Sequence, residues 1–389
     1  MAGPLDGVRI IDITSVIAGP FATMILGDLG ATVIKIESPR GDDSRHLGPP
    51  FLHGTGVPFL GLNRNKYSLC LNLKQPAAID VVYRLAESAD VFLESNRPGT
   101  MERLGLGYEV LRQRNPRIIY CSNTPYGTAG PHREQAGYEL AIQGYAGVMY
   151  RGDKPPQREQ QSIVDISTGM TMIYSILAAL YARERTGVGQ RLDLSMLGAI
   201  MSVQAARFVD GPQDPQTTAR TQGAAATYRP YMTQDHWIIV GVLNDNLFRK
   251  LCLAIGRPEL CDEPRFASHA KRVEHEQALT DIISTTLQRQ PAAMWLERLR
   301  AAGVPCSPIQ PLAALFDDPQ LQANDLVAEV EHPHIGTLKT YGLATKFSAT
   351  PASIRLPAPE LGEHTDCILK ELGYSAEDIT ALRQQGALG

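Results

Sequence analysis

One carboxylic acid of this sequence stands where it could act as a nucleophile. Asp165 lies in the segment Ser162-Ile-Val-Asp-Ile-Ser-Thr-Gly169, among apolar residues at the predicted start of a long helix. Aspartate at a helix start often serves only as an N-cap, which accepts hydrogen bonds from free backbone N–H groups. The positive end of a helix would also keep a partly buried carboxylate ionised, which suits covalent catalysis. The local sequence leaves both interpretations open.

Other catalytic patterns are missing from the sequence. It contains neither the Gly-x-Ser-x-Gly turn of serine hydrolases nor a phosphate-binding P-loop. The first predicted strand is followed by Thr14-Ser-Val-Ile-Ala-Gly-Pro20, with one glycine where a dinucleotide-binding turn needs three. Gly-x-Gly triplets that begin at Gly54, Gly105 and Gly187 lack the third glycine and follow no strand. A nicotinamide-dependent dehydrogenase is therefore disfavoured.

The cysteines and histidines do not indicate a disulfide framework or a metal site. The six cysteines are scattered over 389 residues without a Cys-x-x-Cys pair, and several lie in apolar runs. We predict that they are mostly reduced, buried thiols. The nine histidines lack the His-Glu-x-x-His spacing of a zinc helix, and His332-Pro-His334 has no third ligand nearby. We expect no bound metal.

The composition is that of a globular protein without a strong excess of charge. Hydrophobic residues make up 43% of the chain, which provides enough apolar surface for a core. With 37 basic and 41 acidic residues the net charge is −4, which does not favour nucleic acid as a partner. The apolar runs are far shorter than the roughly 20 residues of a membrane span, and the N-terminus does not have a signal-peptide layout. We expect a soluble, cytoplasmic protein that binds neither nucleic acid nor membrane.

The elements that must position Asp165 alternate between strands and helices. Short runs rich in β-branched residues predict strands, and segments with helical spacing between them predict helices. The predicted strands cover residues 8–12, 31–36, 68–73, 90–93, 118–122 and 191–196, and the main helices cover 21–29, 76–88 and 167–185. Strand–helix–strand units of this kind build a parallel sheet, so we predict a large, Rossmann-like open-sheet α/β domain.

The character of the sequence changes after the long helix. From about residue 208 to 228 it is rich in Asp, Gln, Thr, Gly and Pro, which indicates a linker. A second region follows, with a predicted strand at 237–242 and helices near 246–255, 273–287 and 294–302. We therefore expect a second, smaller α+β domain. Near the C-terminus, Ser375 and Asp378 have the spacing of a capping box before a last short helix.

Seven blocks of sequence occur in a fixed order along almost the whole chain. They are Ser-Val-Ile-Ala-Gly-Pro at 15–20 with Gly-Asp-Leu-Gly-Ala-Thr-Val-Ile-Lys-Ile-Glu at 27–37, Asn-Arg-Asn-Lys at 63–66, Arg-Pro-Gly at 97–99, Glu-Arg-Leu-Gly-Leu-Gly at 102–107, Asn-Pro-Arg-Ile-Ile-Tyr at 115–120, Arg-Thr-Gly-Val-Gly-Gln at 185–190 and Leu-Gly-Glu-His-Thr-Asp at 361–366. In this order they resemble the class III CoA-transferases (the CaiB/BaiF superfamily), which include formyl-CoA transferase and carnitine CoA-transferase.

The resemblance implies a domain plan and an assembly. The first part of the large CoA-binding domain would cover residues 1–205, and a linker 206–226. The small domain would cover 227–325, and residues 326–389 would return to the large domain. The resemblance also implies an interlaced homodimer that uses coenzyme A and acyl-CoA as substrates, with small carboxylic acids, and that holds no tightly bound cofactor.

The resemblance also implies a reaction. In that family the nucleophile is an aspartate just before a long helix, and Asp165 occupies the matching position. CoA passes from an acyl-CoA thioester to a free carboxylic acid. The aspartate forms an acyl-aspartyl anhydride, which the released CoA converts into an aspartyl-CoA thioester. The acceptor carboxylate then opens this thioester through a second anhydride.

The α-methylacyl-CoA racemases share this fold and provide the alternative function. They use a histidine–aspartate pair, and their histidine falls in the segment that here reads Gly137-Tyr-Glu-Leu-Ala-Ile-Gln143. This chain has Tyr138 followed by Glu139, as in the transferases, and tyrosine is a poor base at neutral pH. The resemblance therefore assigns Tyr138 and Glu139 to the catalytic site with Asp165. These three residues also argue against a third candidate, a non-catalytic acyl-CoA-binding protein.

Several contacts with CoA are implied in the same way. By family position, Val16, Lys74 and Arg103 contact CoA and Ala18 lines the floor of the site. Arg40, on a loop beside a matched block, is a further candidate cation for the CoA phosphates.

The sequence also departs from the family pattern near this site. Ser95 stands where the family commonly has an asparagine contact for CoA. Ile17 replaces a glutamine of formyl-CoA transferase, and Gly223-Ala-Ala-Ala-Thr227 replaces its mobile loop of four glycines. Alanine restricts the backbone freedom that such a loop uses. We therefore expect an acid that is larger or less polar than oxalate.

Overall fold

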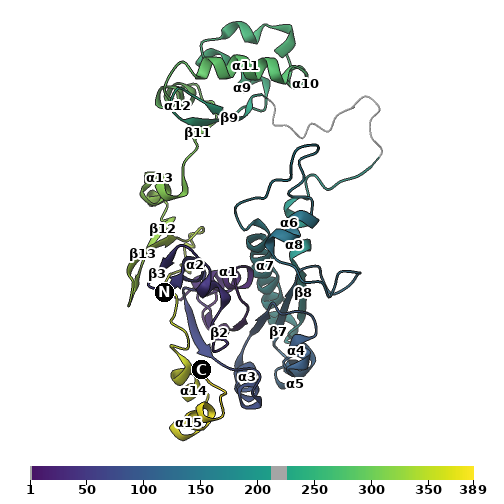
Figure 1. Cartoon of the computed structure of the whole chain (residues 1–389), viewed down its shortest axis with the longest axis vertical. Coiled ribbons are helices and arrows are strands. Elements are labelled where there is room, and N and C mark those ends of the chain that lie inside the picture. Colours follow the sequence, from purple (N-terminus) through teal and green to yellow (C-terminus); the bar gives the residue numbers. More distant parts are fainter. Residues whose placement is uncertain (1, 212–225) are drawn as a thin grey trace. The chain divides into compact units, whose positions relative to one another are not determined.

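The computed structural model describes residues 2–211 and 226–389. The chain forms two compact units (Figure 1). The larger comprises Met1–Val209 with Gln320–Gly389, and the smaller comprises Asp210–Pro319. Most of the predicted linker at 206–226, and of the alanine-containing loop at 223–227, lies outside the described residues. Each unit has its own hydrophobic core.

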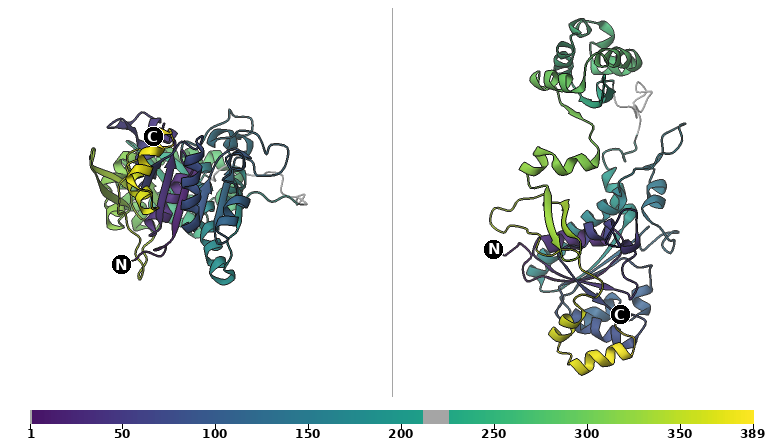
Figure 2. Two further views of the ribbon diagram at one scale, coloured as in Figure 1. Left: turned by 90° about the horizontal axis from the view of Figure 1, so that it is seen from below. Right: turned by 60° about the vertical axis from the view of Figure 1, so that its left-hand side comes forward.

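The larger unit is built on a six-stranded parallel sheet, which is seen in Figure 2. Its strand order is β5–β2–β1–β6–β7–β8. The strands are β1 (Arg9–Ile13), β2 (Thr32–Glu37), β5 (Lys66–Cys70), β6 (Val91–Glu94), β7 (Ile119–Thr124) and β8 (Arg191–Ser195). All six predicted strands are thus confirmed, with small shifts at their ends. The chain runs outward in opposite directions from β1, and open α/β sheets bind ligands beyond the carboxyl ends of strands at such a switch point.

Helices cover both faces of this sheet. The side chains of adjacent strand residues point to opposite faces, so Ile10 joins one core and Ile11 the other. The Ile10 core contains residues of α1 (Ala18–Asp28) and α7 (Ile163–Thr186). The Ile11 core contains residues of α3 (Pro76–Ser88), α5 (Tyr108–Arg114), α14 (Thr365–Glu371) and α15 (Ala376–Gln384). The capping box predicted from Ser375 and Asp378 is present at the start of α15.

Shorter elements complete the larger unit. They are β3 (Phe51–Leu52), β4 (Thr55–Gly56), α2 (Val57–Leu62), α4 (Thr100–Arg103), α6 (Glu139–Tyr145), α8 (Met196–Val203), α13 (Pro319–Ala323), and the hairpin β12 (Val327–His332) with β13 (Gly336–Tyr341). The segment after the hairpin packs onto the N-terminal part of the chain. Asn65 Oδ1 accepts hydrogen bonds from the backbone N–H groups of Arg355, at 2.7 Å, and Leu356, at 2.9 Å.

The smaller unit combines an antiparallel sheet with helices. The sheet has the order β11–β10–β9, from β9 (Tyr228–Met232), β10 (Trp237–Gly241) and β11 (Cys306–Pro308). Its helices are α9 (Asp245–Ala254), α10 (His269–Glu274), α11 (Glu276–Leu287) and α12 (Ala292–Ala301). Phe248, Leu251 and Trp295 are buried in its core. The strand and the three helices predicted for this region are confirmed.

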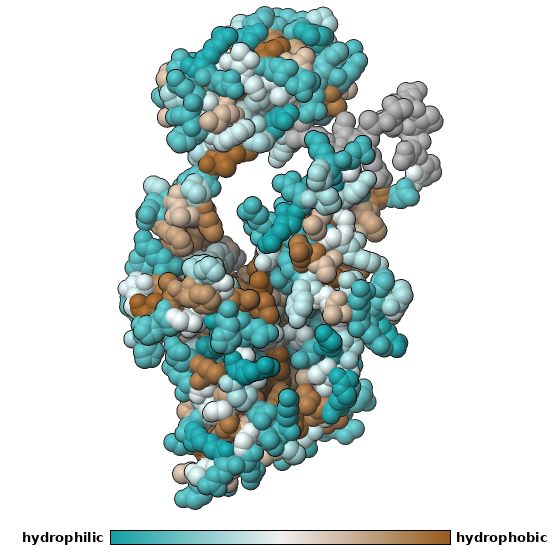
Figure 3. All heavy atoms as spheres, in the orientation of Figure 1, coloured by the Kyte–Doolittle hydropathy of each residue, from teal (hydrophilic) through white to brown (hydrophobic). Residues whose placement is uncertain are grey.

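Asp165 lies in α7, which is the longest helix among the described residues. Among the described residues, it alone is long and apolar enough to cross a membrane, judged by length and composition only. Buried helices of globular proteins also meet this test, and Met172 and Ile176 of α7 lie fully within the core. In Figure 3 most of the visible surface is hydrophilic, with hydrophobic side chains in patches between polar ones.

A glycine allows α7 to approach α1 closely. A Cβ atom added to Gly169 would lie 2.7 Å from the backbone oxygen of Ala18 and 2.7 Å from Cδ1 of Phe21. No side chain fits at this distance without moving one of the helices. Asp165 lies one turn before Gly169, so the close contact brings its carboxylate to the N-terminal end of α1.

The first prediction concerns this contact. Gly169→Ala should separate α1 from α7, which lowers the free energy of unfolding by about 1–3 kcal/mol as overpacking does. The change should also lower any activity that depends on Asp165. Thermal unfolding and turnover of the purified variant measure both effects. Gly61→Ala is the matched control, since Gly61 is also in a helix but an added Cβ would meet nothing within 4 Å. Equal behaviour of the two variants would contradict the prediction.

Candidate active site

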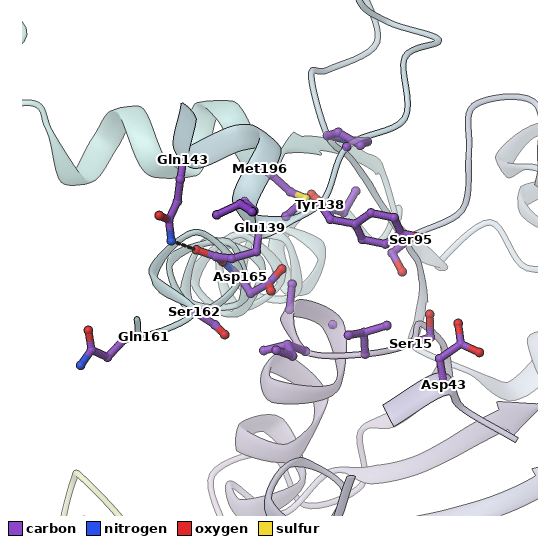
Figure 4. Close-up of a pocket in the computed structure, with 18 of the residues that line it drawn as sticks. Ser15, Asp43, Ser95, Tyr138, Glu139, Gln143, Gln161, Ser162, Asp165 and Met196 are labelled. Atoms are coloured by element: carbon purple, nitrogen blue, oxygen red, sulfur yellow. Dashed lines mark hydrogen bonds between the residues drawn. The ribbon is translucent and has the colours of Figure 1, made fainter. Parts of the chain in front are cut away.

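A cavity of about 540 Å³ opens at the carboxyl edge of the parallel sheet. Loops that follow β1, β6 and β7 contribute Ser15, Ser95 and Pro125 to its lining. The first residues of α1, α6 and α7 complete it, and Tyr138, Glu139 and Asp165 are seen together in Figure 4. The structure thus brings together the three predicted catalytic residues, although Asp165 is 26 residues from Glu139 in the sequence.

Asp165 is not the N-cap of α7, so that interpretation is wrong. The helix begins at Ile163, its N-cap residue is Ser162, and Asp165 lies inside its first turn. The free N–H groups of this turn are bound by Glu139 instead. The backbone N–H of Asp165 donates to Glu139 Oε2 at 2.7 Å, and that of Val164 donates to Glu139 Oε1 at 3.2 Å. The Asp165 carboxylate is therefore left to face the cavity.

Glu139 is held in this position by its own helix. Gln143, one turn later in α6, donates from Nε2 to Glu139 Oε1 at 2.7 Å and is itself buried. The Gln143 side chain also accepts a hydrogen bond from the backbone N–H of Glu159 at 3.0 Å. The capping carboxylate is thus oriented by a second polar contact, which fixes the distance between α6 and α7.

The electrostatic surroundings of Asp165 differ from the expectation drawn from the helix dipole. Burial, followed by the nearby negative charge of Glu139, raises the pKa of Asp165 to about 7. The positive end of α7 is already neutralised in part by the Glu139 carboxylate. Asp165 therefore changes between its neutral and ionised forms near physiological pH, which is typical of catalytic carboxylates rather than of structural ones.

Tyr138 lines the same cavity but is not packed into the core. Its side chain is 74% exposed, and the residue is the N-cap of α6. Ala18 and Gly19 line the cavity as the first two residues of α1. The backbone N–H groups in the first turn of a helix have no partner within the helix, so these two can donate to an oxygen in the cavity.

A second cavity, of about 500 Å³, lies beyond β1, β2 and β5 and contains the predicted cations Lys74 and Arg103. It shares Ser15, Asp43 and Asn96 with the first cavity. The two cavities therefore meet at these three residues.

The other predicted CoA contacts divide between the lining and the surface. Val16, Ala18 and Ser95 line the first cavity. Arg40 does not line either cavity; it is exposed, and its backbone oxygen lies 3.1 Å from Nε2 of His46. Its loop neighbours Ser38 and Gly41 do line the second cavity, so a contact of Arg40 with CoA stays a prediction.

The sequence analysis missed one asparagine and two arginines that line the site. Asn96 lines both cavities, one position after Ser95, where the family pattern was sought. A one-residue shift of that asparagine could have been noticed in Glu94-Ser-Asn96. Arg97 and Arg158 also line the first cavity. Their position depends on loop conformation, for which the sequence carries no signal.

Comparison with known proteins agrees with this geometry. The profile of CoA-transferase family III matches residues 5–365 of the chain. The chain belongs to CoA-transferase family III. It is 38% identical over 393 residues to succinyl-CoA:glutarate CoA-transferase of Mus musculus, and the match covers 99% of this chain and 90% of that protein. It is 36% identical over 378 residues to acetyl-CoA:oxalate CoA-transferase of Acetobacter aceti, covering 95% and 96% of the two chains.

Solved structures indicate the same family. A crystal structure of a CaiB/BaiF family protein from Brucella suis superimposes with a TM-score of 0.84 at 33% identity, covering 96% of this chain and all of that one. The class III family and its mixed α/β fold with a large parallel sheet are thus confirmed. The protein is a CoA-transferase, an enzyme that moves CoA between acyl-CoA thioesters and carboxylic acids.

The second prediction concerns the pH dependence of this CoA-transferase. If ionised Asp165 is the active form, kcat/KM rises with pH through a midpoint near 7. Glu139→Gln removes a negative charge next to Asp165, so the pKa of Asp165 falls and the midpoint moves to lower pH. Glu159→Gln is the control: Glu159 lines the same cavity, but pairs with Arg151 at 2.7 Å and not with Asp165. A midpoint that stays near 7 in Glu139→Gln would refute the assignment.

Proposed function

We propose that this enzyme transfers CoA from an acyl-CoA to a small carboxylic acid through covalent intermediates on Asp165. The observation that carries the proposal is the Asp165 carboxylate itself: it faces the cavity, it does not cap its helix, and its pKa is about 7. No cysteine or histidine is among the described residues that line this cavity. A thiol nucleophile or the histidine base of a racemase therefore has no support here.

The proposed reaction has four steps. An Asp165 oxygen attacks the thioester carbonyl of the donor, the C–S bond breaks, and CoA leaves as a thiolate. The thiolate then attacks the Asp165 carbonyl carbon, which releases the donor acid and leaves an aspartyl-CoA thioester. The acceptor carboxylate attacks this thioester to form a second anhydride and free thiolate. Finally the thiolate attacks the acceptor's acyl carbon, which gives the new acyl-CoA and restores the Asp165 carboxylate.

Each attack on a carbonyl carbon passes through a tetrahedral species with negative charge on the carbonyl oxygen, and the site offers hydrogen-bond donors for this oxygen. The N–H groups of Ala18 and Gly19 at the start of α1 are suitable, because Gly169 brings Asp165 to this end of the helix. The Tyr138 hydroxyl is exposed at the rim, where it can donate to the carboxylate of an acid. Glu139 disfavours the ionised form of free Asp165 and thereby disfavours the resting enzyme relative to the acylated one, which carries no charge at residue 165.

The second cavity is proposed to hold the nucleotide part of CoA. Lys74 and Arg103 line it, and the guanidinium of Arg103 donates only to the hydroxyl of Thr100, at 3.0 Å, among the hydrogen bonds of the described residues. Both cations are exposed and so can bind the phosphates of CoA. Asn96, between the two cavities, is placed to contact the pantetheine arm.

We further propose that the enzyme is a homodimer. The exposed side of α7 carries Met170, Tyr174 and Tyr181, which are 55%, 59% and 61% exposed. These residues follow helical spacing, so they form one apolar stripe on the exposed side of the helix. A second copy of the chain would cover this stripe, in keeping with the interlaced assembly that the sequence resemblance implies.

The substrate acids are proposed to be dicarboxylic acids of four or five carbons. One relative is named succinyl-CoA:glutarate CoA-transferase and another succinate–glutarate CoA-transferase. The lining of the reaction cavity includes two arginines, Arg97 and Arg158, and Arg158 makes no ion pair with another described residue. A cation beside the reacting carboxylate can bind the distal carboxylate of such an acid.

The third prediction tests this substrate class with succinyl-CoA as donor. Glutarate should be a better acceptor than pentanoate, which has the same carbon count without the second carboxylate, by at least about tenfold in kcat/KM. Arg158→Gln should reduce this preference, whereas Lys154→Gln, in the same loop but outside the cavity lining, should preserve it. Product thioesters are measured by mass spectrometry. Equal use of both acids by the unaltered enzyme would overturn the dicarboxylate assignment.

The fourth prediction tests the nucleophile. Asp165→Ala should lower turnover by roughly a thousandfold or more, as nucleophile deletions do. Acyl-CoA followed by hydroxylamine should convert Asp165 of the unaltered enzyme into a hydroxamate, found on the peptide around residues 162–170. Label confined to Glu139, or near-native turnover of the Ala variant, would exclude Asp165 as the carrier.

A stability measurement distinguishes this loss from unfolding. Because the folded-state pKa of Asp165 is raised, its contribution to stability is fully present below the unfolded-state pKa near 3.8 and is lost as pH rises towards 7. Asp165→Asn should therefore raise the melting temperature, and by more at pH 8 than at pH 5. A variant that is inactive and more stable at pH 8 would show that residue 165 serves the reaction and not the fold.

A further inference from the structure

The turn that leads from β1 into α1 has an unfavourable backbone conformation at the cavity wall. Val16 has φ of 72°, in the left-handed region that branched side chains rarely adopt. The residue lines the reaction cavity, and it precedes Ile17, the N-cap residue of α1, and Ala18, its first residue. Strain of this kind persists only where surrounding contacts enforce it.

One buried carboxylate supplies such a contact. The backbone N–H of Val16 donates to Asp42 Oδ1 at 3.1 Å, across 26 residues of sequence. The same oxygen accepts hydrogen bonds from Ser44, from the backbone N–H at 2.8 Å and from the hydroxyl at 2.7 Å. The Asp42 backbone N–H donates to Glu37 Oε2 at 3.0 Å. Asp42 is therefore fixed at both its backbone and its side chain.

A buried lysine completes the arrangement. Lys35 Nζ lies 2.7 Å from Asp42 Oδ2, and the side chains are 0% and 1% exposed. Lys35 also donates to the backbone oxygen of Thr14 at 2.9 Å. The lysine and the carboxylate thus hold the turn from its two ends, at Thr14 and at Val16.

We propose that Asp42, paired with Lys35, is a positioning residue that holds Val16 in its left-handed conformation and so aims the start of α1 at Asp165. The inference rests on the proposed function in one respect: it takes the reaction cavity as the site of CoA transfer. Asp42 lines the second cavity but not the reaction cavity, so its effect at Asp165 passes through the turn. The charged groups around this pair are Glu37, Asp12 and Lys66, which are buried with it.

The buried pair of Asp12 with Lys66 also contacts this turn, at Thr14, but another buried ion pair of the larger unit does not. Asp28 and Arg64 pair at 2.7 Å with both side chains 2% exposed, as deeply buried as Lys35 and Asp42. Their other hydrogen bonds go to Asn65 and Tyr341, away from the Thr14–Val16 turn. Loss of this pair should affect stability alone, which makes it a matched comparison for the role of Asp42.

The fifth prediction is a double-mutant cycle on Val16 and Asp42. Glycine adopts positive φ without strain, so Val16→Gly no longer needs Asp42 to enforce the turn. Asp42→Asn should lower kcat/KM for CoA transfer by about 10- to 100-fold in the native background, since small misplacements of catalytic groups cost this much. In the Val16→Gly background the same change should cost less than about threefold. Equal losses in the two backgrounds would overturn the proposal.

Two further variants keep the test decisive if Asp42→Asn does not fold. Val16→Pro removes the N–H and excludes positive φ, whereas Val16→Gly keeps both, although each removes the valine side chain. The proline variant should be at least about tenfold less active than the glycine variant; similar activities would reject the proposal. Asp28→Asn should lower the melting temperature without changing kcat/KM.

The dissociation constant of CoA separates this inference from the proposed function. It is measured by calorimetry for the same variants and needs no turnover. If the unaltered protein binds CoA but transfers none, the proposed function fails, while the cycle on CoA binding still decides the role of Asp42. In that case, additive effects of Val16→Gly and Asp42→Asn on the dissociation constant of CoA would contradict the proposed role of Asp42.

Discussion

The candidate site depends on one interaction, the capping of α7 by the side chain of Glu139. A helix start in a protein interior needs partners for its free N–H groups, and a carboxylate from another element satisfies two of them. This capping releases Asp165 from the structural role that its position would otherwise give it. It also places a second carboxylate next to Asp165, and burial together with this neighbour raises the pKa of Asp165 to about 7.

The arrangement is unfavourable for stability and useful for chemistry. Two partly buried carboxylates at a helix start repel one another, and the fold tolerates them because Gln143 and the helix N–H groups bind Glu139. A covalent step that neutralises residue 165 removes the repulsion. The same logic applies at Val16, where buried contacts hold a strained backbone at the cavity wall. Functional sites often concentrate such local conflicts.

The carboxyl edge of the sheet carries an unusual number of buried charges. Asp12 and Lys66, 3.2 Å apart, are both fully buried below the turn that follows β1, and burial lowers the pKa of Lys66 to about 8. Such pairs add little net stability, because desolvation offsets their attraction. Their geometric value is greater: Asp12 binds Thr14 and Thr23, which ties the end of β1 to α1. The sheet edge is thereby made rigid where it meets the cavity.

Much of the fold followed from local patterns in the sequence. The six strands of the parallel sheet, the long helix and the capping box at Ser375 were all predicted, because period, β-branching and caps act over a few residues. The family motifs likewise pointed to Asp165, Tyr138 and Glu139, and the structure places all three around one cavity. These residues were found through short contiguous blocks, each of which a single sequence carries in full.

What the sequence could not determine is which charges meet across the fold. The local sequence predicted that Asp165 is an N-cap or an ionised nucleophile. In the structure Glu139 caps the helix instead, and burial with this neighbour raises the pKa of Asp165. The sequence offered Arg40 for CoA, whereas the structure lines the second cavity with the loop neighbours Ser38 and Gly41 and not with Arg40. It gave no sign that Asp42 binds the backbone of Val16. Electrostatic effects depend on distance and burial, and both arise only when strands and loops distant in sequence come together.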